Sequence, residues 1–288
     1  MRILTLLFAL GLAACAPRPA VPDASAVIAA ERAFAAEAGE SGWVEAFIEY
    51  STEDALLLGA GPTNAHAALS GIDPANRGDT TLSWGPDFAG MSRGGDFGFT
   101  TGPYNGGGEA FGQYFTVWRR QADGSWKWIF DGGVNGQTPT IVDAEGEVAV
   151  VGIAAAGAGS ANAALVAIDA EEAAFAEAAA GDAAGALETR LTEGGRVNRE
   201  DMAPASGAAA AAAALPAGGV RYGAPQVREA AAAGDMVFTL GEARWDGGSG
   251  YFARIWVLQE DGWRIAYDQI ALRPLDDPEP QAEPAATP

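Results

Sequence analysis

Few side chains in this sequence could move a proton inside a protected site. His66 is the only histidine among the 288 residues. Tyr114 opens, and Asp131 closes, a segment of aromatic and aliphatic residues that is typical of buried strands. A carboxyl, imidazole or phenol group in an apolar pocket can act as a general acid or base. We therefore take His66, Asp131 and Tyr114 as the candidate catalytic residues.

The direction of the two strand-end aspartates follows from strand alternation. Successive side chains of a strand point to opposite faces, and Asp131 shares its parity with Lys127, as Asp268 does with Arg264. The two basic side chains should face water. Both aspartates are therefore expected to point outward, unless a β-bulge interrupts the alternation.

The sequence argues against several other functional classes. A single histidine and a single cysteine offer no ligand cluster, so neither a metal nor a cofactor is predicted. His66 follows Asn64, a good N-cap for a short helix, where a lone histidine is usually a surface residue. The glycine-rich segments 59–62 and 106–108 do not open a helix after a strand, so they are turns and not nucleotide loops. The net charge of -21 excludes a nucleic-acid binder, which needs a basic surface.

One sequence pattern occurs twice in the chain. The segment YFTVWRRQADGSWKWIFD, which starts at Tyr114, returns as YFARIWVLQEDGWRIAYD, which starts at Tyr251. Further upstream, the matching segments are 95–100 with 234–239, and 31–34 with 172–175. A repeat of this length indicates two similar domains.

The domain boundaries follow from this repeat and from composition. We assign residues 26–135 to the first domain, 136–163 to a linker and 164–274 to the second domain, and we expect a disordered tail over 275–288. In each domain helical periodicity comes first, and antiparallel strands separated by turn residues follow, which predicts an α+β fold. The linker contains one apolar stretch, 148–153, that could add a strand.

The order of elements, the domain length and the Asp-Gly hairpin resemble the nuclear transport factor 2-like superfamily, and within it the SnoaL-like branch. The residues that carry the resemblance are Glu31 to Phe34, Thr52 to Ala55, and Val117 to Arg120 with Asp123, Gly124, Trp126 and Asp131. The resemblance implies two tandem cone-shaped domains, each a curved antiparallel sheet packed on N-terminal helices, with an apolar pocket at one end. It also implies open sheet faces of the kind that often dimerise, so a homodimer is expected.

Aromatic side chains would line such a pocket, although any such sheet also needs aromatic residues for its core. In the first domain the candidate ligand-binding residues are Trp84, Tyr104, Trp118 and Trp128. In the second domain the corresponding aromatic residues are Tyr222, Trp245, Tyr251, Trp256 and Tyr267. The second copy also has alanine throughout 208–214, with no polar side chain to orient a ligand. We expect the first domain to keep a ligand-competent pocket and the second to act mainly as a scaffold.

The N-terminus has the pattern of a lipoprotein signal. Residues 1–14 contain an apolar run well short of the roughly 20 residues that span a bilayer. The segment from Leu12 to Cys15 resembles the bacterial lipobox, which implies cleavage before Cys15 and lipidation of its thiol. Residues 15–25 then form a tether. Because Ala16 and not aspartate follows the cysteine, the expected location is the outer membrane, facing the periplasm, with the lipid as the anchor.

Two functions of different classes remain open. The favoured hypothesis is an acidic envelope lipoprotein without catalytic activity, whose pocket binds a small apolar ligand or whose surface binds a partner, because no paired acid and base is visible. The alternative is a ketosteroid isomerase or SnoaL-like acid–base enzyme that acts from the first domain. The direction of the side chains distinguishes them, since two titratable groups that converge in one apolar pocket would favour the enzyme.

Overall fold

The structure is a computed structural model that describes residues 23–77, 79–107, 111–136, 142–153, 157, 159–213, 215 and 218–272. The predicted signal peptide 1–14, Cys15 and the predicted tail 275–288 lie outside the described residues. Within those that are described, no helix is both long and apolar enough to cross a membrane.

The first domain begins with helices and continues as a sheet. Its helices are α1 (Ser25–Ser41), α2 (Trp43–Tyr50), α3 (Ala65–Ser70) and the 3-10 turn η1 (Pro74–Asn76). Its strands are β1 (Ser51–Leu58), β2 (Pro62–Asn64), β3 (Ser83–Trp84), β4 (Phe88–Met91), β5 (Phe97–Asn105), β6 (Phe111–Arg120) and β7 (Trp126–Asn135). As the sequence predicted, Asn64 caps α3, where its side chain accepts a hydrogen bond from the Ala67 amide at 2.9 Å.

The second domain repeats this order. Its helices are α4 (Ala161–Gly181), α5 (Ala183–Arg190) and α6 (Ala208–Ala213). Its strands are β9 (Leu191–Arg199), β10 (Ala205–Ser206), β11 (Arg221–Tyr222), β12 (Val227–Ala230), β13 (Met236–Trp245), β14 (Gly248–Gln259) and β15 (Gly262–Leu272). Between the domains, β8 (Ala149–Val150) falls in the apolar stretch of the linker and pairs with β4 of the first sheet.

Each domain is a mainly antiparallel sheet covered on one face by its helices. The strand orders are β2-β1-β7-β6-β5-β4-β8 in the first sheet and β10-β9-β15-β14-β13-β11 in the second. The first strand of each domain joins the last in parallel, as β1 with β7 and β9 with β15. The structure confirms the predicted fold class, an α+β chain of two tandem domains with curved sheets packed on N-terminal helices.

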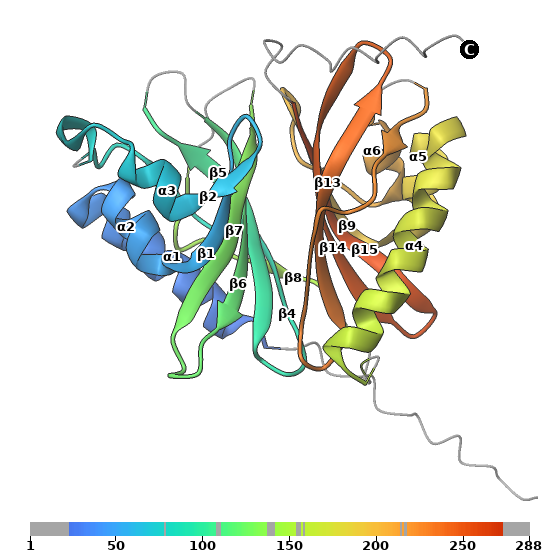
Figure 1. The fold of residues 1–288 in the computed structure, drawn as a ribbon, viewed down its shortest axis with the longest axis horizontal. Coiled ribbons are helices and arrows are strands. Elements are labelled where there is room, and N and C mark those ends of the chain that lie inside the picture. The colour runs from blue at the N-terminus through green and yellow to red at the C-terminus, as the bar shows by residue number, and fades with distance from the viewer. Residues whose placement is uncertain are drawn as a thin grey trace, which may run out of the picture.

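The two sheets face each other in the middle of the molecule, with the helices on the outside (Figure 1). The arrangement therefore has four layers: helix, sheet, sheet and helix. The described residues form three apolar cores. One core lies between the helices and sheet of the first domain, around Phe34 and Trp118. Another lies within the second domain, around Phe175 and Trp256.

The third core fills the space between the two sheets. Phe115 of β6 stacks on Tyr267 of β15 with ring centroids 4.1 Å apart, and Phe130 of β7 meets Phe238 of β13 at 4.8 Å. All four side chains are buried. The open sheet faces that the family resemblance assigned to a homodimer are thus covered by each other within one chain.

Two hydrogen bonds at one end of the molecule join the domains, and each domain supplies one donor and one acceptor. The Arg93 amide donates to Asp235 at 3.0 Å, and the Ala232 amide donates to Asp96 at 2.9 Å. The two aspartates occupy matching positions of the repeat.

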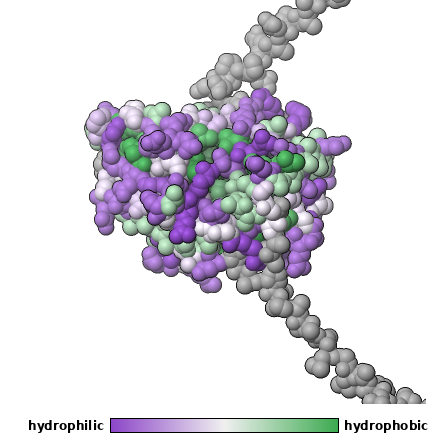
Figure 2. All heavy atoms as spheres, turned by 60° about the horizontal axis from the view of Figure 1, so that its bottom comes forward, coloured by the Kyte–Doolittle hydropathy of each residue, from purple (hydrophilic) through white to green (hydrophobic). Residues whose placement is uncertain are grey.

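On the outer surface, Figure 2 shows hydrophilic side chains over much of the face that it presents, with apolar side chains in smaller patches.

If the core between the sheets joins the domains energetically, Phe115→Leu and Tyr267→Leu should not have additive effects on the free energy of unfolding. Their stacked rings should give a coupling of roughly 0.5–1.5 kcal/mol in a double-mutant cycle. Urea denaturation of the full chain measures it. The control pair is Phe115→Leu with Phe175→Leu, from two separate cores, which should be additive; additivity in both cycles would contradict the coupling.

Candidate functional site

Two β-bulges decide which way the strand-end carboxyls point. Between β6 and β7, Val117 pairs with Phe130 and Trp118 pairs with Trp128, so Ile129 is an extra residue. Both Ile129 and Phe130 therefore face the other sheet, and the next side chain, Asp131, turns toward the helices. The expectation that Asp131 points outward is wrong, because it is only 9% exposed.

The second domain contains the same bulge. Ile255 pairs with Tyr267 and Trp256 pairs with Ile265, so Ala266 is the extra residue. Asp268 is fully buried, and the prediction that it faces solvent is wrong for the same reason.

Asp131 reaches a cavity of about 400 Å³ in the first domain. The cavity is mainly apolar, and both domains contribute to its wall. Its lining residues are Phe47, Leu57, Leu58, Gly59, Leu82, Trp84, Tyr104, Tyr114, Asp131, Gly132, Gly133, Asn135, Glu200, Ala271 and Leu272. A pocket of this size and character suits a small ligand.

The Asp131 carboxyl is shielded from water at the cavity wall. Burial raises its pKa well above the usual range, and the hydrogen bond between Thr116 and Asp131, at 2.7 Å, opposes this shift only in part. The negative charge of buried Glu31 raises the pKa further. A raised pKa favours the protonated form of Asp131, and in that form the carboxyl can donate a hydrogen bond.

Tyr114 presents a second neutral donor to the same cavity. The side chain is 7% exposed, and its hydroxyl has no hydrogen-bond partner among the described residues. The Thr100 hydroxyl, which donates to Glu31, lies near enough to lower the pKa of Tyr114 slightly, against the larger effect of burial. Burial raises the pKa of Tyr114 well above its ordinary value. An unsatisfied buried hydroxyl is costly, so this atom is suited to a ligand oxygen.

Glu31 of α1 is a buried acceptor that holds neighbouring side chains of the site in place. Its carboxyl accepts hydrogen bonds from the indole N–H of Trp84 at 2.6 Å and from that of Trp118 at 3.0 Å, and also from Thr100. Burial raises the pKa of Glu31. These bonds fix the orientation of Trp84, whose ring forms part of the cavity wall.

The other predicted site residues occupy different positions. Trp84 and Tyr104 line the cavity, whereas Trp118 and Trp128 are fully buried in the core behind it and are not part of the lining. His66 is also outside the lining, and its Nε2 lies 2.9 Å from the Ser51 hydroxyl. Of the three candidate catalytic residues, only Asp131 and Tyr114 come together.

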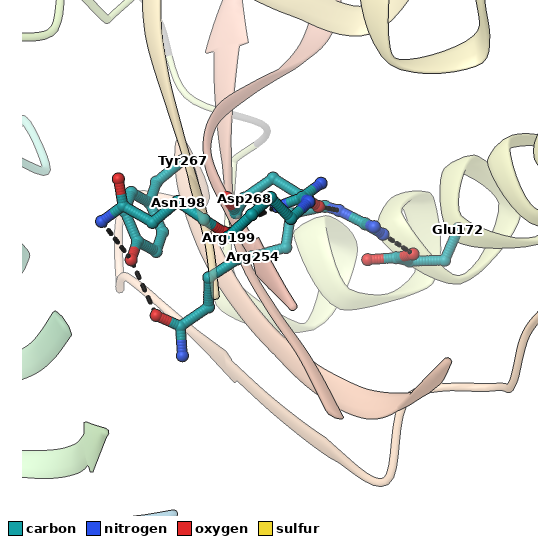
Figure 3. A network of polar contacts seen from close by, with 7 residues as sticks. Glu172, Asn198, Arg199, Arg254, Tyr267 and Asp268 are labelled. Atoms are coloured by element: carbon teal, nitrogen blue, oxygen red, sulfur yellow. Dashed lines mark hydrogen bonds and ion pairs between the residues drawn. The ribbon is translucent and has the colours of Figure 1, made fainter. Parts of the chain in front are cut away.

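In the second domain a buried arginine occupies the equivalent interior. Arg254 donates to Glu172 of α4 at 2.6 Å and to Asp268 at 2.7 Å, and Arg199 donates to Asp268 at 2.5 Å (Figure 3). Arg254 and Asp268 are fully buried. Removing one partner from such a buried ion pair costs about 3–5 kcal/mol.

Aromatic rings enclose the same guanidinium. Its central carbon lies 4.3 Å from the ring centroid of Phe175, 4.9 Å from that of Tyr222 and 4.7 Å from that of Phe252. These are distances at which a cation is attracted to a ring face. The second interior is thus filled by its own side chains, where the first holds a cavity.

Equivalent hydrogen bonds in the two domains show which residues of the repeat correspond to each other. Trp118 donates to Glu31 as Trp256 donates to Glu172, so Thr116, two residues before Trp118, corresponds to Arg254. An alignment that places Tyr114 on Tyr251 is one residue out of register in this strand. Because side chains alternate along a strand, Tyr251 faces the other sheet, as does Tyr267, and neither belongs to the interior of the second domain.

The sequence contained a signal for this shift. When Asp123-Gly124 is aligned with Asp261-Gly262, Ser125 has no counterpart in the second copy. Glu31 and Glu172 could likewise have been singled out as acids repeated on an amphipathic helix. Glu200 had no such signal, since only the packing of the two domains brings it to the cavity.

Across the described ranges, no group of three or more histidine, cysteine, aspartate or glutamate residues is arranged to hold a metal ion.

Comparisons with known proteins concern domain-sized parts of the chain. No protein-family model and no curated protein matches it. Among solved structures, an NTF2-like protein with a cystatin-like fold from Novosphingobium aromaticivorans is 22% identical, with a TM-score of 0.31, over 40% of this chain and 84% of its own. A protein of unknown function from Pectobacterium atrosepticum is 19% identical, with a TM-score of 0.32, over 38% of this chain and 90% of its own. A putative ketosteroid isomerase from Shewanella frigidimarina is 15% identical, with a TM-score of 0.29, over 39% of this chain and 98% of its own. These structures are of the kind that the sequence resembles.

Asp131→Asn should change how the free energy of unfolding depends on pH. The folded-state pKa of Asp131 is raised above its unfolded value of about 3.9, so above that pH the native state holds a proton that the unfolded state has released. Wild-type stability should therefore fall as pH rises above about 4, by up to about 1.4 kcal/mol per unit, until the folded pKa is passed.

The Asp131→Asn variant keeps a neutral side chain and should lack this contribution. Urea denaturation at several pH values between about 4 and 7 measures the difference. Asp54→Asn, at an exposed position of β1, serves as the control and should follow the wild-type profile. Parallel profiles for wild type and Asp131→Asn would show that Asp131 is not a neutral buried acid.

Proposed function

We propose that the first domain binds a small, mainly apolar molecule that carries an oxygen acceptor such as a carbonyl group. The observation that carries this proposal is that Tyr114, whose hydroxyl lacks a hydrogen-bond partner among the described residues, and Asp131 line the same mainly apolar cavity. The apolar wall would receive the body of the ligand, and the Tyr114 hydroxyl would gain the hydrogen-bond partner that it lacks. The filled interior of the second domain supports a scaffold role for that half.

The choice of binding over catalysis rests on protonation. A general base must be able to accept a proton, and burial raises the pKa of Asp131 and of Tyr114, which favours their protonated forms. Hydrogen-bond donors in the wall of an apolar cavity are sufficient to orient a ligand.

Acid–base catalysis is the second candidate, because two titratable groups do converge in one apolar pocket. Two donors at a carbonyl oxygen would also stabilise the negative charge that develops when a neighbouring C–H loses its proton. Incorporation of solvent deuterium next to the carbonyl of a bound ketone, at a rate that depends on Asp131, would favour this reaction over simple binding.

We also propose that lipid on Cys15 anchors the protein to the outer membrane, facing the periplasm, where the pocket would meet small molecules of the envelope. The support is the sequence from Leu12 to Cys15 and the Pro- and Ala-rich tether. Feeding cells a clickable palmitate analogue should label the wild type and not Cys15→Ser. An unlabelled wild type, or a labelled Cys15→Ser variant, would contradict the anchor.

Tyr114→Phe tests the binding proposal with a fluorescent ketone, acetylnaphthalene. Loss of one hydrogen bond should weaken its binding about fivefold, which corresponds to about 1 kcal/mol. Ethylnaphthalene, which has no acceptor, should bind wild type and variant alike. Tyr222→Phe removes a hydroxyl from the second domain and should leave both affinities unchanged; an equal loss for the two ligands would speak against a hydrogen bond to Tyr114.

A further inference from the structure

The cavity in the first domain is incomplete without the second domain. Glu200, Ala271 and Leu272 of the second domain form part of its lining. Leu272 is 51% exposed, which places it where the cavity wall meets solvent. The tandem copy therefore takes part in whatever the first cavity binds.

The Glu200 carboxyl is held in place by backbone groups from both domains. One oxygen accepts from the Asn135 amide at 2.7 Å, and the other accepts from the Leu272 amide at 3.2 Å. The Asn135 side chain in turn accepts from the Tyr104 hydroxyl at 3.0 Å. These contacts join Glu200 to the part of the wall that Tyr104 forms.

A strained turn fixes the position of Glu200 further. Asp201 has φ of 57°, and it is the one non-glycine residue with positive φ in the described part of the chain. Its amide donates to the Asn135 carbonyl at 2.9 Å. Such a conformation persists where its surroundings hold it, and it is often found beside functional groups.

The lining contains acidic but no basic side chains. Burial raises the pKa of Glu200, and the hydrogen bonds from the Asn135 and Leu272 amides oppose that rise and favour its carboxylate form. Asp131 and Glu200 are its only ionisable groups other than tyrosines, and no lysine, arginine or histidine belongs to the described lining. An anionic ligand would find no counter-ion there. The hydroxyl of Tyr114, a lining residue that is 7% exposed, has no hydrogen-bond partner among the described residues and independently indicates a polar ligand atom in the cavity.

We infer that Glu200 determines ligand class: the first cavity takes an amphipathic amine, whose cationic nitrogen pairs with Glu200 while its apolar body extends toward Tyr114. This inference rests on the proposed binding function and adds the charge of the ligand. A carboxylate has about four acceptor positions, of which the two backbone amides occupy two, so a protonated amine can still bind. The overall charge of -21 also draws cations toward the protein.

The test compares three acetylnaphthalenes that differ only in the group at the far end of the ring system: methyl, aminomethyl or carboxylate. Wild type should bind the aminomethyl compound about fivefold more tightly than the methyl compound and the carboxylate compound most weakly. In Glu200→Gln the advantage of the amine should vanish, and the carboxylate compound should gain affinity. The affinity of the methyl compound should stay within about twofold, because glutamine keeps an acceptor oxygen for the backbone.

Glu193→Gln is the matched control, because it removes the same charge from an exposed position of β9 and should keep the wild-type order of affinities. Equal binding of the methyl and aminomethyl compounds to wild type, or equal behaviour of the Glu200→Gln and Glu193→Gln variants, would overturn the assignment while the binding function stands. Failure of all three compounds to bind wild type would overturn both.

Discussion

The apolar layer between the two sheets is the constraint on which the rest of the structure depends. A sheet of this kind buries one face under its own helices and leaves the other face open. Here the open faces, with Phe115 and Tyr267 stacked at their centre, cover each other. Because apolar burial is the main source of stability, this layer places the end of β9 against the end of β7, and so makes Glu200 part of a cavity in the other domain.

The two domains differ in the groups that surround their buried acidic side chains. Each buries a helix glutamate beneath a tryptophan, Glu31 under Trp118 and Glu172 under Trp256, and each turns a strand-end aspartate inward through a bulge. In the second half Arg254 lies between the two acids and fills the interior. The first half has a threonine there, so its acids are left without a cation, and burial favours their neutral forms. The two interiors thus differ at one pair of equivalent positions, Thr116 and Arg254, in whether a cation lies between the buried acids.

Much of the fold was accessible from the sequence because its signals are local. Asn64 caps a helix through its own side chain, the Asp-Gly turns mark hairpins, and the duplicated strand pattern indicates two domains. The candidate site was less accessible. Asp131 and Tyr114 could be named from their residue types, but the outward direction inferred for Asp131 was wrong, since alternation assumes an unbroken ladder and Ile129 interrupts it. His66 had the right chemistry but sits on α3 against Ser51.

The sequence by itself therefore determined the element order, the repeat, the α+β class and the residue types available for chemistry, because each depends on neighbours in the chain. Only the tertiary structure decided which side chains meet. A one-residue bulge reverses a strand face. The equivalence of Thr116 and Arg254 follows from the matching bonds of Trp118 and Trp256 to the helix glutamates. Glu200 reaches the cavity through contacts across the domain boundary. Such placements depend on packing between segments far apart in sequence, which no local pattern encodes.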